Sequence, residues 1–310
     1  MDERVKEHFM RLEKSYLKNK FSNIYFDEKL SKYSWFNLGG LAEVFYRPDN
    51  KKELSDFLKH VKEKNYSINI FGAGSNTLIR DGGVKGISIK LSSKFSYLKN
   101  LENNEIEVGA ATLDKKLSDH ATKYAMKNFE FLSCIPGSIG GAVRMNSGCY
   151  GHEISENIIS IEVMNLDGEI KEIKKNKINF FYRGCDLKND LIILSVRFKV
   201  QVGKKEDIKN KQIKLIELKK NDQPTGIKTC GSTFKNPKNQ KAWKLIKESN
   251  CEKFKVGKAK ISEKHCNFFV NEGNSSSSEI EELINKVKKE VKKKTGENLE
   301  LEIRIVGEKL

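Results

Sequence analysis

The chain of 310 residues lacks the sequence signals of several large classes of protein. No apolar run approaches the roughly 18–20 residues that cross a bilayer, and residues 1–20 are charged throughout, without an apolar signal segment. Its six cysteines form no CxxC pair and its five histidines no HxxxH or HxH pair, so we expect reduced thiols and no metal site. A GxSxG elbow, a P-loop and an HExxH helix are also absent, which argues against the common hydrolase, kinase and zincin classes. We therefore expect a cytoplasmic protein without membrane contact.

The composition is that of a polar globular protein with a strongly basic balance. Hydrophobic residues make up 37% and charged residues 32% of the chain, and the formal net charge is +16. The length suffices for two or three domains. The lysines are scattered and no compact basic segment interleaves with aromatic residues, so we expect solvated helix faces that attract small anions rather than a nucleic-acid site.

The pattern of short strands and a few helices indicates an α+β fold rather than a regular βαβ array. Residues Ile158–Ile173 read as a hairpin that turns at Asp167-Gly168. Ser275–Thr295 reads as a helix that begins with a capping box and has one apolar face. The alternation of Leu299–Val306 predicts a final strand with apolar residues on one face and charged residues on the other.

Two glycine-rich stretches are candidates for holding a phosphate-bearing ligand. Phe131–Gly151 contains five glycines and a Pro-Gly turn, so its backbone N–H groups are free to face a pyrophosphate. Gly72–Asn76 directly follows a buried strand, but Thr77 occupies the third glycine position and a strand-like segment follows, so this is not the dinucleotide fingerprint. Each stretch alone is equally compatible with an ordinary tight turn.

Polar residues that could carry chemistry occur in the second half of the chain. These residues also have simpler interpretations. Arg183 could be a surface charge, Ser232 a turn hydroxyl and Glu302 one of a row of solvated residues on a two-faced strand. The spacing of these residues alone does not favour a catalytic role over the simpler interpretations. The candidates are Tyr182, Arg183, Ser232, Lys235, Asn236, His265, Asn267 and Glu302.

Several segments in a fixed order resemble the UDP-N-acetylenolpyruvoylglucosamine reductases, also called UDP-N-acetylmuramate dehydrogenases, flavoenzymes of bacterial peptidoglycan precursor synthesis. The resemblance covers nearly the whole chain from Ser34 onward, and residues 1–20 lie outside it. The segments are SWFNLGG (34–40), FGAGSNTLIRDGGVKGISI (71–89), IPGSIGGAVRMNSGCYG (135–151), FYRGCD (181–186), GSTFKNP (231–237), ISEKHCNFFVN (261–271) and LELEIR (299–304).

The resemblance implies a fold and a domain organisation. We expect an α+β chain with a two-subdomain FAD-binding fold of the vanillyl-alcohol-oxidase type, followed by a C-terminal α+β substrate domain. The expected divisions are an N-terminal helical extension at 1–20, FAD-binding subdomains at 21–95 and 96–205, and the substrate domain at 206–310.

The resemblance also implies the reaction and its two cofactors, which are bound FAD and the hydride donor NADPH. In the family, reduced flavin delivers hydride to C3 of UDP-N-acetylglucosamine enolpyruvate, and a serine protonates C2 to give UDP-N-acetylmuramate. The matching positions here are Ser232 as the acid, with Arg183 and Glu302 as the other catalytic residues. These residue types suit the chemistry, because a guanidinium stabilises enolate-like charge and a carboxylate can orient a serine hydroxyl.

By the same resemblance, the glycine-rich stretches hold the flavin cofactor and the later segments hold the UDP-sugar. The expected cofactor-binding residues are Gly72, Ala73, Gly74, Ser75, Asn76, Pro136, Gly137, Ser138, Gly140, Gly141, Ala142, Asn146 and Gly148. The expected substrate-binding residues are Tyr182, Lys235, Asn236, Lys264, His265 and Asn267. The expected partners are the UDP-sugar and NADPH, with no nucleic acid and no membrane, and we expect a monomer.

Some positions depart from the family pattern, and two other functions stay open. Cys185 stands where serine is more usual, Asn37 where a basic residue is common and Leu41 where we expect proline. The chain is also short of the insertion that carries a tyrosine over the substrate, which predicts the loop-lacking type. The alternatives are a flavin oxidase with another small substrate and a non-catalytic nucleic-acid-binding protein.

Overall fold

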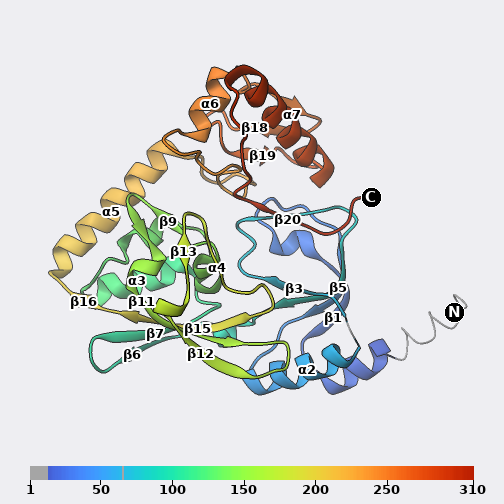
Figure 1. Cartoon of the computed structure of the whole chain (residues 1–310), viewed down its shortest axis with the longest axis vertical. Coiled ribbons are helices and arrows are strands. Elements are labelled where there is room, and N and C mark those ends of the chain that lie inside the picture. Colours follow the sequence, from blue (N-terminus) through green and yellow to red (C-terminus); the bar gives the residue numbers. More distant parts are fainter. Residues whose placement is uncertain (1–12, 65) are drawn as a thin grey trace, which may run out of the picture.

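The computed structural model of the chain describes residues 13–64 and 66–310 and has an α+β fold, as the sequence predicts (Figure 1). Residues 13–20 are helical, and Leu17 buries its side chain against the first sheet. The remainder of the predicted N-terminal helix, residues 1–12, lies outside the described residues. Within the described part of the chain, no helix combines the length and the apolar character needed to cross a membrane.

The first sheet has four strands in the order β1-β2-β5-β3 and is mostly parallel. β1 (Ile24–Lys29) is antiparallel to β2 (Leu41–Tyr46), whereas β2, β5 (Val84–Lys90) and β3 (Ile68–Phe71) run parallel. Helix α2 (Lys51–Glu63) begins at Asn50, whose side chain accepts a hydrogen bond from the N–H of Glu53, and covers one face of the sheet. The carboxyl ends of the three parallel strands therefore meet at one edge, where β3 leads into the Gly72–Asn76 loop.

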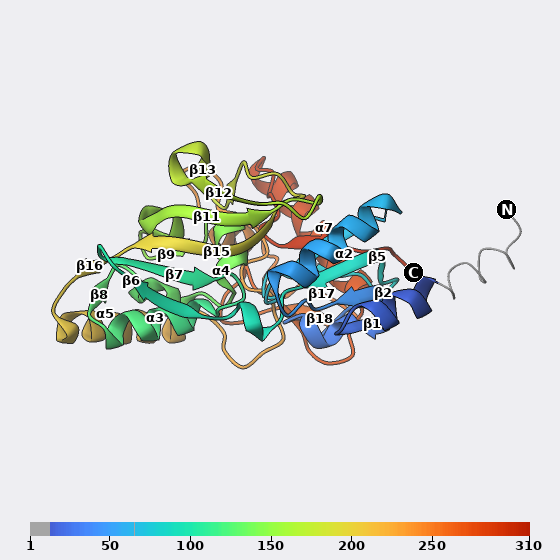
Figure 2. The same ribbon diagram turned by 90° about the horizontal axis from the view of Figure 1, so that it is seen from below.

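The second sheet has five antiparallel strands in the order β12-β11-β15-β7-β6. The predicted hairpin is confirmed, with Gly168 at φ +75° in its turn. The strands are β6 (Leu98–Leu101), β7 (Glu105–Gly109), β11 (Ile158–Met164), β12 (Ile170–Lys174) and β15 (Ile192–Lys199). The helices of this layer are α3 (Asp114–Lys123), α4 (Ile139–Arg144) and α5 (Lys205–Asp222). Figure 2 shows α3 and α5 on one side of this sheet.

Short elements connect these layers. The 3₁₀ helices are η1 (Leu30–Tyr33), η2 (Ser93–Phe95), η3 (Glu130–Cys134), η4 (Ile154–Asn157) and η5 (Lys175–Lys177). The short strands are β4 (Thr77–Ile79), β8 (Met126–Lys127), β9 (Gly148–Cys149), β10 (His152–Glu153), β13 (Phe180–Phe181), β14 (Gly184–Cys185) and β16 (Gln201–Val202).

Helix α5 leads from the second sheet to the C-terminal part of the chain (Figure 1). The predicted helix is present there as α7 (Ser277–Thr295), with the capping box formed by Ser276 and Glu279, and it ends at Gly296 with φ +79°. It packs with α6 (Ala242–Glu248) and a three-stranded antiparallel sheet around a separate apolar core. The strands of that sheet are β17 (Lys255–Val256), β18 (Ala259–Ile261) and β19 (Phe269–Asn271).

The predicted final strand, Leu299–Val306, is mostly wrong. Only Arg304–Val306 forms a strand, β20, which pairs in parallel with β4 beside the first sheet. The chain bends at Glu302, because the N–H of Glu302 donates to the carbonyl of Thr233 (2.9 Å) and its carbonyl accepts from Asn76 Nδ2 (3.0 Å). The alternation in the sequence reflects burial of the apolar side chains, whereas Glu302 belongs to a cavity rather than to a solvated face.

Candidate active site

A cavity of about 900 Å³ lies where the two sheets and the C-terminal part meet. Its wall contains the Gly72–Asn76 loop, the Pro136–Ala142 segment, the Gln223–Ile227 segment and Glu302. This volume is within the range of roughly 300–1,000 Å³ that is typical of ligand sites. Both glycine-rich stretches that the sequence marks therefore face the same space.

The first glycine-rich stretch needs glycine because other parts of the chain approach it closely. Gly74 has φ +74°, and a Cβ there would lie 1.8 Å from the carbonyl oxygen of Tyr33. A Cβ on Gly72 would lie 3.0 Å from Ser138 Oγ, which places the two loops against each other. The result is a wall of bare backbone that a pyrophosphate can approach.

The cavity wall is strongly electropositive. In the part of the chain that the structure describes, six basic side chains line it: Arg47, Lys90, Arg144, Arg183, Lys219 and Arg304. Among the described residues, the acidic side chains of the wall are Asp114 and Glu302, and burial raises the pKa of the Asp114 carboxyl well above its usual range. Burial, together with the charge of Arg47, lowers the pKa of Lys90 to about 8. A dinucleotide with two phosphates fits such a wall.

The basic side chains nearest the first glycine-rich loop were not predicted from the sequence. Arg47 directly follows β2, Lys90 ends β5, and Lys90 Nζ donates to the carbonyl of Gly72. Because β2, β5 and β3 are parallel, Arg47, Lys90 and Gly72 gather at one edge of the sheet. Ligands bind at the carboxyl ends of strands in open parallel sheets. The order of the strands is therefore needed to place Arg47 and Lys90 at this site.

Arg183 and Glu302 form an ion pair in the cavity wall. Arg183 Nε donates to Glu302 Oε1 at 2.7 Å, and both side chains are largely buried. Burial raises the pKa of the Glu302 carboxyl, while the charge of Arg183 acts in the opposite direction. Arg183 has φ +59°, an unusual conformation for a residue with a side chain, in the turn between β13 and β14. The turn thus holds the guanidinium against the carboxylate.

Ser232 lies in the same wall, on a segment that is hydrogen-bonded on both sides. The N–H of its neighbour Thr233 donates to the carbonyl of Asn267 (2.7 Å), and the carbonyl of Thr233 accepts from the N–H of Glu302 (2.9 Å). Asn76 donates to the carbonyl of Glu302, so the first glycine-rich loop is tied to this segment too. The fold therefore brings the three residues assigned to catalysis into one cavity.

Most of the residues assigned to FAD line the cavity, and Asn146 is the exception. The Asn146 side chain is buried, donates to Glu153 Oε2 (2.6 Å) and to the carbonyl of Phe181 (3.2 Å), and accepts from the N–H of Ser155 (3.4 Å). These hydrogen bonds stabilise the second glycine-rich stretch, although Asn146 itself is outside the cavity wall.

The residues assigned to the UDP-sugar lie outside the described cavity wall. Asn267 binds both backbone groups of Phe234, at 2.9 and 2.8 Å, and Asn236 accepts from the N–H of Ala242 (3.0 Å). Their amides stabilise the segment that carries Ser232. The other four are Tyr182, Lys235, Lys264 and His265.

Those four side chains make contacts at the edges of this region. The Tyr182 ring lies 4.9 Å from the Arg183 guanidinium carbon, and the Tyr182 hydroxyl accepts from the N–H of Asn236 (3.3 Å). Lys235 pairs with Glu300 at 3.7 Å, and Lys264 Nζ donates to the carbonyl of Lys220 (2.6 Å). His265 packs its ring against Phe268, with centroids 4.8 Å apart.

Comparison with known proteins identifies the family. The FAD binding domain family matches residues 42–174, and the C-terminal domain family of UDP-N-acetylenolpyruvoylglucosamine reductase matches residues 223–306. The reductase of Pelagibacter ubique is 48% identical over 295 residues, which cover 93% of this chain and 97% of that protein. The chain belongs to the UDP-N-acetylenolpyruvoylglucosamine reductase family.

Further relatives of the family agree over nearly the same length. The reductase of Wolbachia pipientis is 40% identical over 91% of this chain and 95% of its own. The crystal structure of the Thermus caldophilus enzyme superposes with a TM-score of 0.79 at 30% identity, over 92% of this chain and 98% of that one. The family resemblance, the FAD-binding fold of the vanillyl-alcohol-oxidase type and the C-terminal α+β part are thereby confirmed.

Membership of the reductase family makes the chain an FAD-dependent oxidoreductase of peptidoglycan synthesis, in a family whose reaction takes hydride from NADPH. The residues present fit FAD. Gly72, Gly74 and Gly137 line the cavity without side chains, and Arg47 and Lys90 supply positive charge at the same edge. The cavity therefore has the donor set that a pyrophosphate-linked cofactor requires.

Gly74→Ala is expected to abolish retention of FAD. The new Cβ would clash with the carbonyl of Tyr33, so the Gly72–Asn76 loop has to move away from its present path. The measurement is the flavin absorbance of the purified variant, followed by titration with FAD. We expect an affinity reduced at least about 100-fold, the scale of roughly 3 kcal/mol that a backbone clash in a fixed loop can cost.

Gly151→Ala is the matched control for this variant. Gly151 also has a left-handed φ, +84°, but a Cβ there would meet no atom of the described residues within 4 Å. The control thus reproduces the backbone strain without the clash and should keep its FAD. Equal loss of FAD in both variants would show that strain alone, and not close approach to Tyr33, explains the requirement for glycine.

Proposed function

We propose that the chain reduces UDP-N-acetylglucosamine enolpyruvate to UDP-N-acetylmuramate with NADPH as the hydride donor. The observation that carries the proposal is that Ser232, Arg183 and Glu302 share one cavity wall with the glycine-rich loops. The electropositive lining suits a substrate that carries a diphosphate and a carboxylate. The names of the relatives support the same substrate.

Bound FAD supplies the hydride that the reaction adds to C3 of the enolpyruvyl ether. Arg183 would stabilise the negative charge that develops over C2 and the carboxylate, since its guanidinium is already fixed by Glu302. Ser232 would donate the proton to C2. Glu302 would orient Arg183 and, through the hydrogen bond between its N–H and Thr233, the segment that carries Ser232.

The arrangement of the elements supports different binding roles for different parts of the chain. We place FAD in the subdomains at 21–95 and 96–205, the UDP-sugar mainly against 206–310, and residues 1–20 as an extension. Tyr182, Lys235, Lys264 and His265 flank the catalytic segments and remain candidates for substrate contacts. We further propose a monomer of the cytoplasm that belongs to the type without the tyrosine-bearing loop.

The test is oxidation of NADPH by the purified protein, followed at 340 nm with and without UDP-N-acetylglucosamine enolpyruvate. We expect substrate-dependent oxidation, and a parallel series with NADH measures the preference for the phosphorylated donor. A flavin-containing protein that ignores this substrate would favour the alternative of a flavin oxidase with another small molecule. NADH used as well as NADPH would overturn the donor assignment alone.

A further inference from the structure

Two cysteines lie in the cavity wall at either end of the second glycine-rich stretch. Cys134 is the last residue of η3 and Cys149 the last residue of β9, and these two elements pack against each other. Both cysteines have free thiols. Between them lies the segment 135–148, which carries the glycines that line the cavity. A bond between the two sulfurs would therefore tie together the ends of the cofactor-facing segment.

The surroundings of the two thiols differentiate them chemically. Cys149 Sγ donates to the carbonyl of Phe131 in η3 at 3.4 Å, which places this thiol beside the element that carries Cys134. The interaction with Cys149 lowers the pKa of the Cys134 thiol to about 7, and Ser133 and the nearby charge of Lys219 act in the same direction, against the effect of burial. The pKa of the Cys149 thiol is raised, mainly by this contact and by burial, so Cys149 keeps its proton. Lys219 is held in place because its Nζ donates to the carbonyl of Cys134 at 2.7 Å.

Another cysteine of the same wall does not have a lowered thiol pKa. Cys230 also lines the cavity, but burial raises its pKa to about 12. Burial likewise raises the pKa of Cys251, to about 11, within the C-terminal core. The thiolate is the reactive form of cysteine, so Cys134 is the nucleophile among these three.

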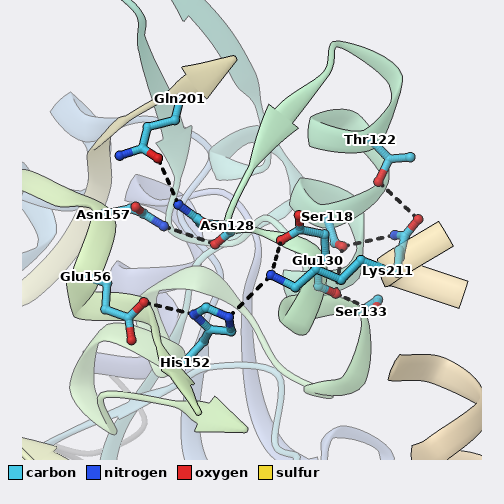
Figure 3. Close-up of polar contacts among 11 residues, drawn as sticks. Ser118, Thr122, Asn128, Glu130, Ser133, His152, Glu156, Asn157, Gln201 and Lys211 are labelled. Carbon is cyan, nitrogen blue, oxygen red and sulfur yellow. Dashed lines mark hydrogen bonds and ion pairs between the residues drawn. The ribbon is translucent and has the colours of Figure 1, made fainter. Parts of the chain in front are cut away.

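A polar network holds the two cysteine-bearing elements together (Figure 3). Lys211 of α5 lies 3.7 Å from Glu130 Oε2 at the start of η3 and donates to His152 Nε2 at 3.4 Å. His152 faces Cys149 across the β9–β10 pair, and its Nδ1 donates to Glu156 (3.1 Å). Lys211 thus links the element that carries Cys134 to the hairpin that carries Cys149.

The η3 side of this link is itself rigidly supported (Figure 3). Ser133 Oγ and Ser118 Oγ both donate to the carbonyl of Glu130, at 2.7 and 3.3 Å. The two thiols are therefore carried by elements that pack against each other rather than by loose loops.

We propose that Cys134 and Cys149 form a modification site that a peroxide converts into an intramolecular disulfide. The Cys134 thiolate attacks one oxygen of hydrogen peroxide, the O–O bond breaks, and Cys134 becomes a sulfenic acid as one water forms. The Cys149 sulfur then attacks the Cys134 sulfur, the S–O bond breaks and the S–S bond forms, and the proton of Cys149 leaves with the second water. Two thiols lose two electrons in total, and one peroxide is reduced to two waters.

The test is treatment of the purified full-length protein with hydrogen peroxide, followed by alkylation of free thiols and non-reducing peptide mapping. We expect a peptide pair joined through Cys134 and Cys149, reversed by a phosphine reductant. We expect Cys134 to be consumed at least about 10-fold faster than Cys266, a half-buried cysteine outside the cavity wall with a raised pKa. Oxidation of all six cysteines at similar rates, or a bridge to another cysteine, would overturn the proposal.

Two variants separate the roles of the pair. Cys149→Ser should stop the reaction at the Cys134 sulfenic acid, which dimedone traps, whereas Cys134→Ser should leave Cys149 unmodified at the same peroxide dose. Cys266→Ser is the matched control and should form the bridge like the unmodified protein. A Cys134→Ser variant whose Cys149 still reacts at the original rate would show that Cys134 is not the nucleophile. Mapping of the unmodified protein decides the proposal even if a variant fails to fold.

Discussion

Ser232→Ala is expected to slow reduction of the enolpyruvyl substrate by about 10²–10⁴-fold, the scale of general acid catalysis. The variant should still bind FAD and should still be bleached by NADPH, because the cofactor loops do not depend on this hydroxyl. Stopped-flow measurement separates the two half-reactions: bleaching of the flavin by NADPH, and its reoxidation by the substrate. Only the second should be slow.

Ser232→Cys and Ser278→Ala provide the comparisons for that variant. The thiol retains a proton donor and should restore part of the lost rate, whereas Ser278 lies on α7 away from the cavity wall and should be neutral. A Ser232→Ala enzyme that turns over at the original rate would remove the serine from the mechanism. A variant that loses FAD would instead assign Ser232 to the structure of the cofactor site.

Arg183→Lys is expected to lower the rate of substrate reduction by about 10²–10³-fold, the usual effect of removing one preorganised donor from a developing anion. The lysine keeps the charge but loses the planar fork that Glu302 fixes at 2.7 Å, so its ammonium is no longer oriented toward the reacting carboxylate. The loss should be mainly in kcat for the substrate, with FAD content and bleaching by NADPH unchanged.

Glu302→Gln should produce a smaller loss of the same kind, since the amide can accept from Arg183 but carries no charge to fix it. Arg197→Lys is the matched control, because Arg197 pairs with Glu105 at 3.8 Å on the second sheet, away from the cavity wall. If Arg183→Lys lost FAD while keeping its rate per bound flavin, Arg183 would be a cofactor-binding residue.

Local patterns in the sequence predicted the local structure well. The capping box of Ser276 and Glu279 and the Asp167-Gly168 turn are both where the spacing placed them, because each depends on residues no more than a few positions apart. Alternation misled at Leu299–Val306, where the bend at Glu302 depends on hydrogen bonds to Thr233 and Asn76. No local pattern contains those contacts.

The site was predictable in its residues but not in its geometry. The family resemblance named Arg183 and Glu302, and the two side chains meet although 119 positions separate them. It could not show that Asn146 and Asn267 use their amides for structural hydrogen bonds. Arg47 and Lys90 were missed for a similar reason, because their proximity to Gly72 follows from the parallel order of β2, β5 and β3.

The pairing of β20 with β4 has a consequence for biosynthesis. Glu302 lies 226 positions after Asn76, so the acidic partner of Arg183 and the strand beside the first glycine-rich loop are made long after that loop. At about 5–20 residues per second, the first sheet is translated many seconds before them. Until Glu302 and β20 have been made, the nascent chain contains only an incomplete, electropositive part of the site. The cavity wall is complete only after Glu302 and β20 have been made and have paired with the earlier segments.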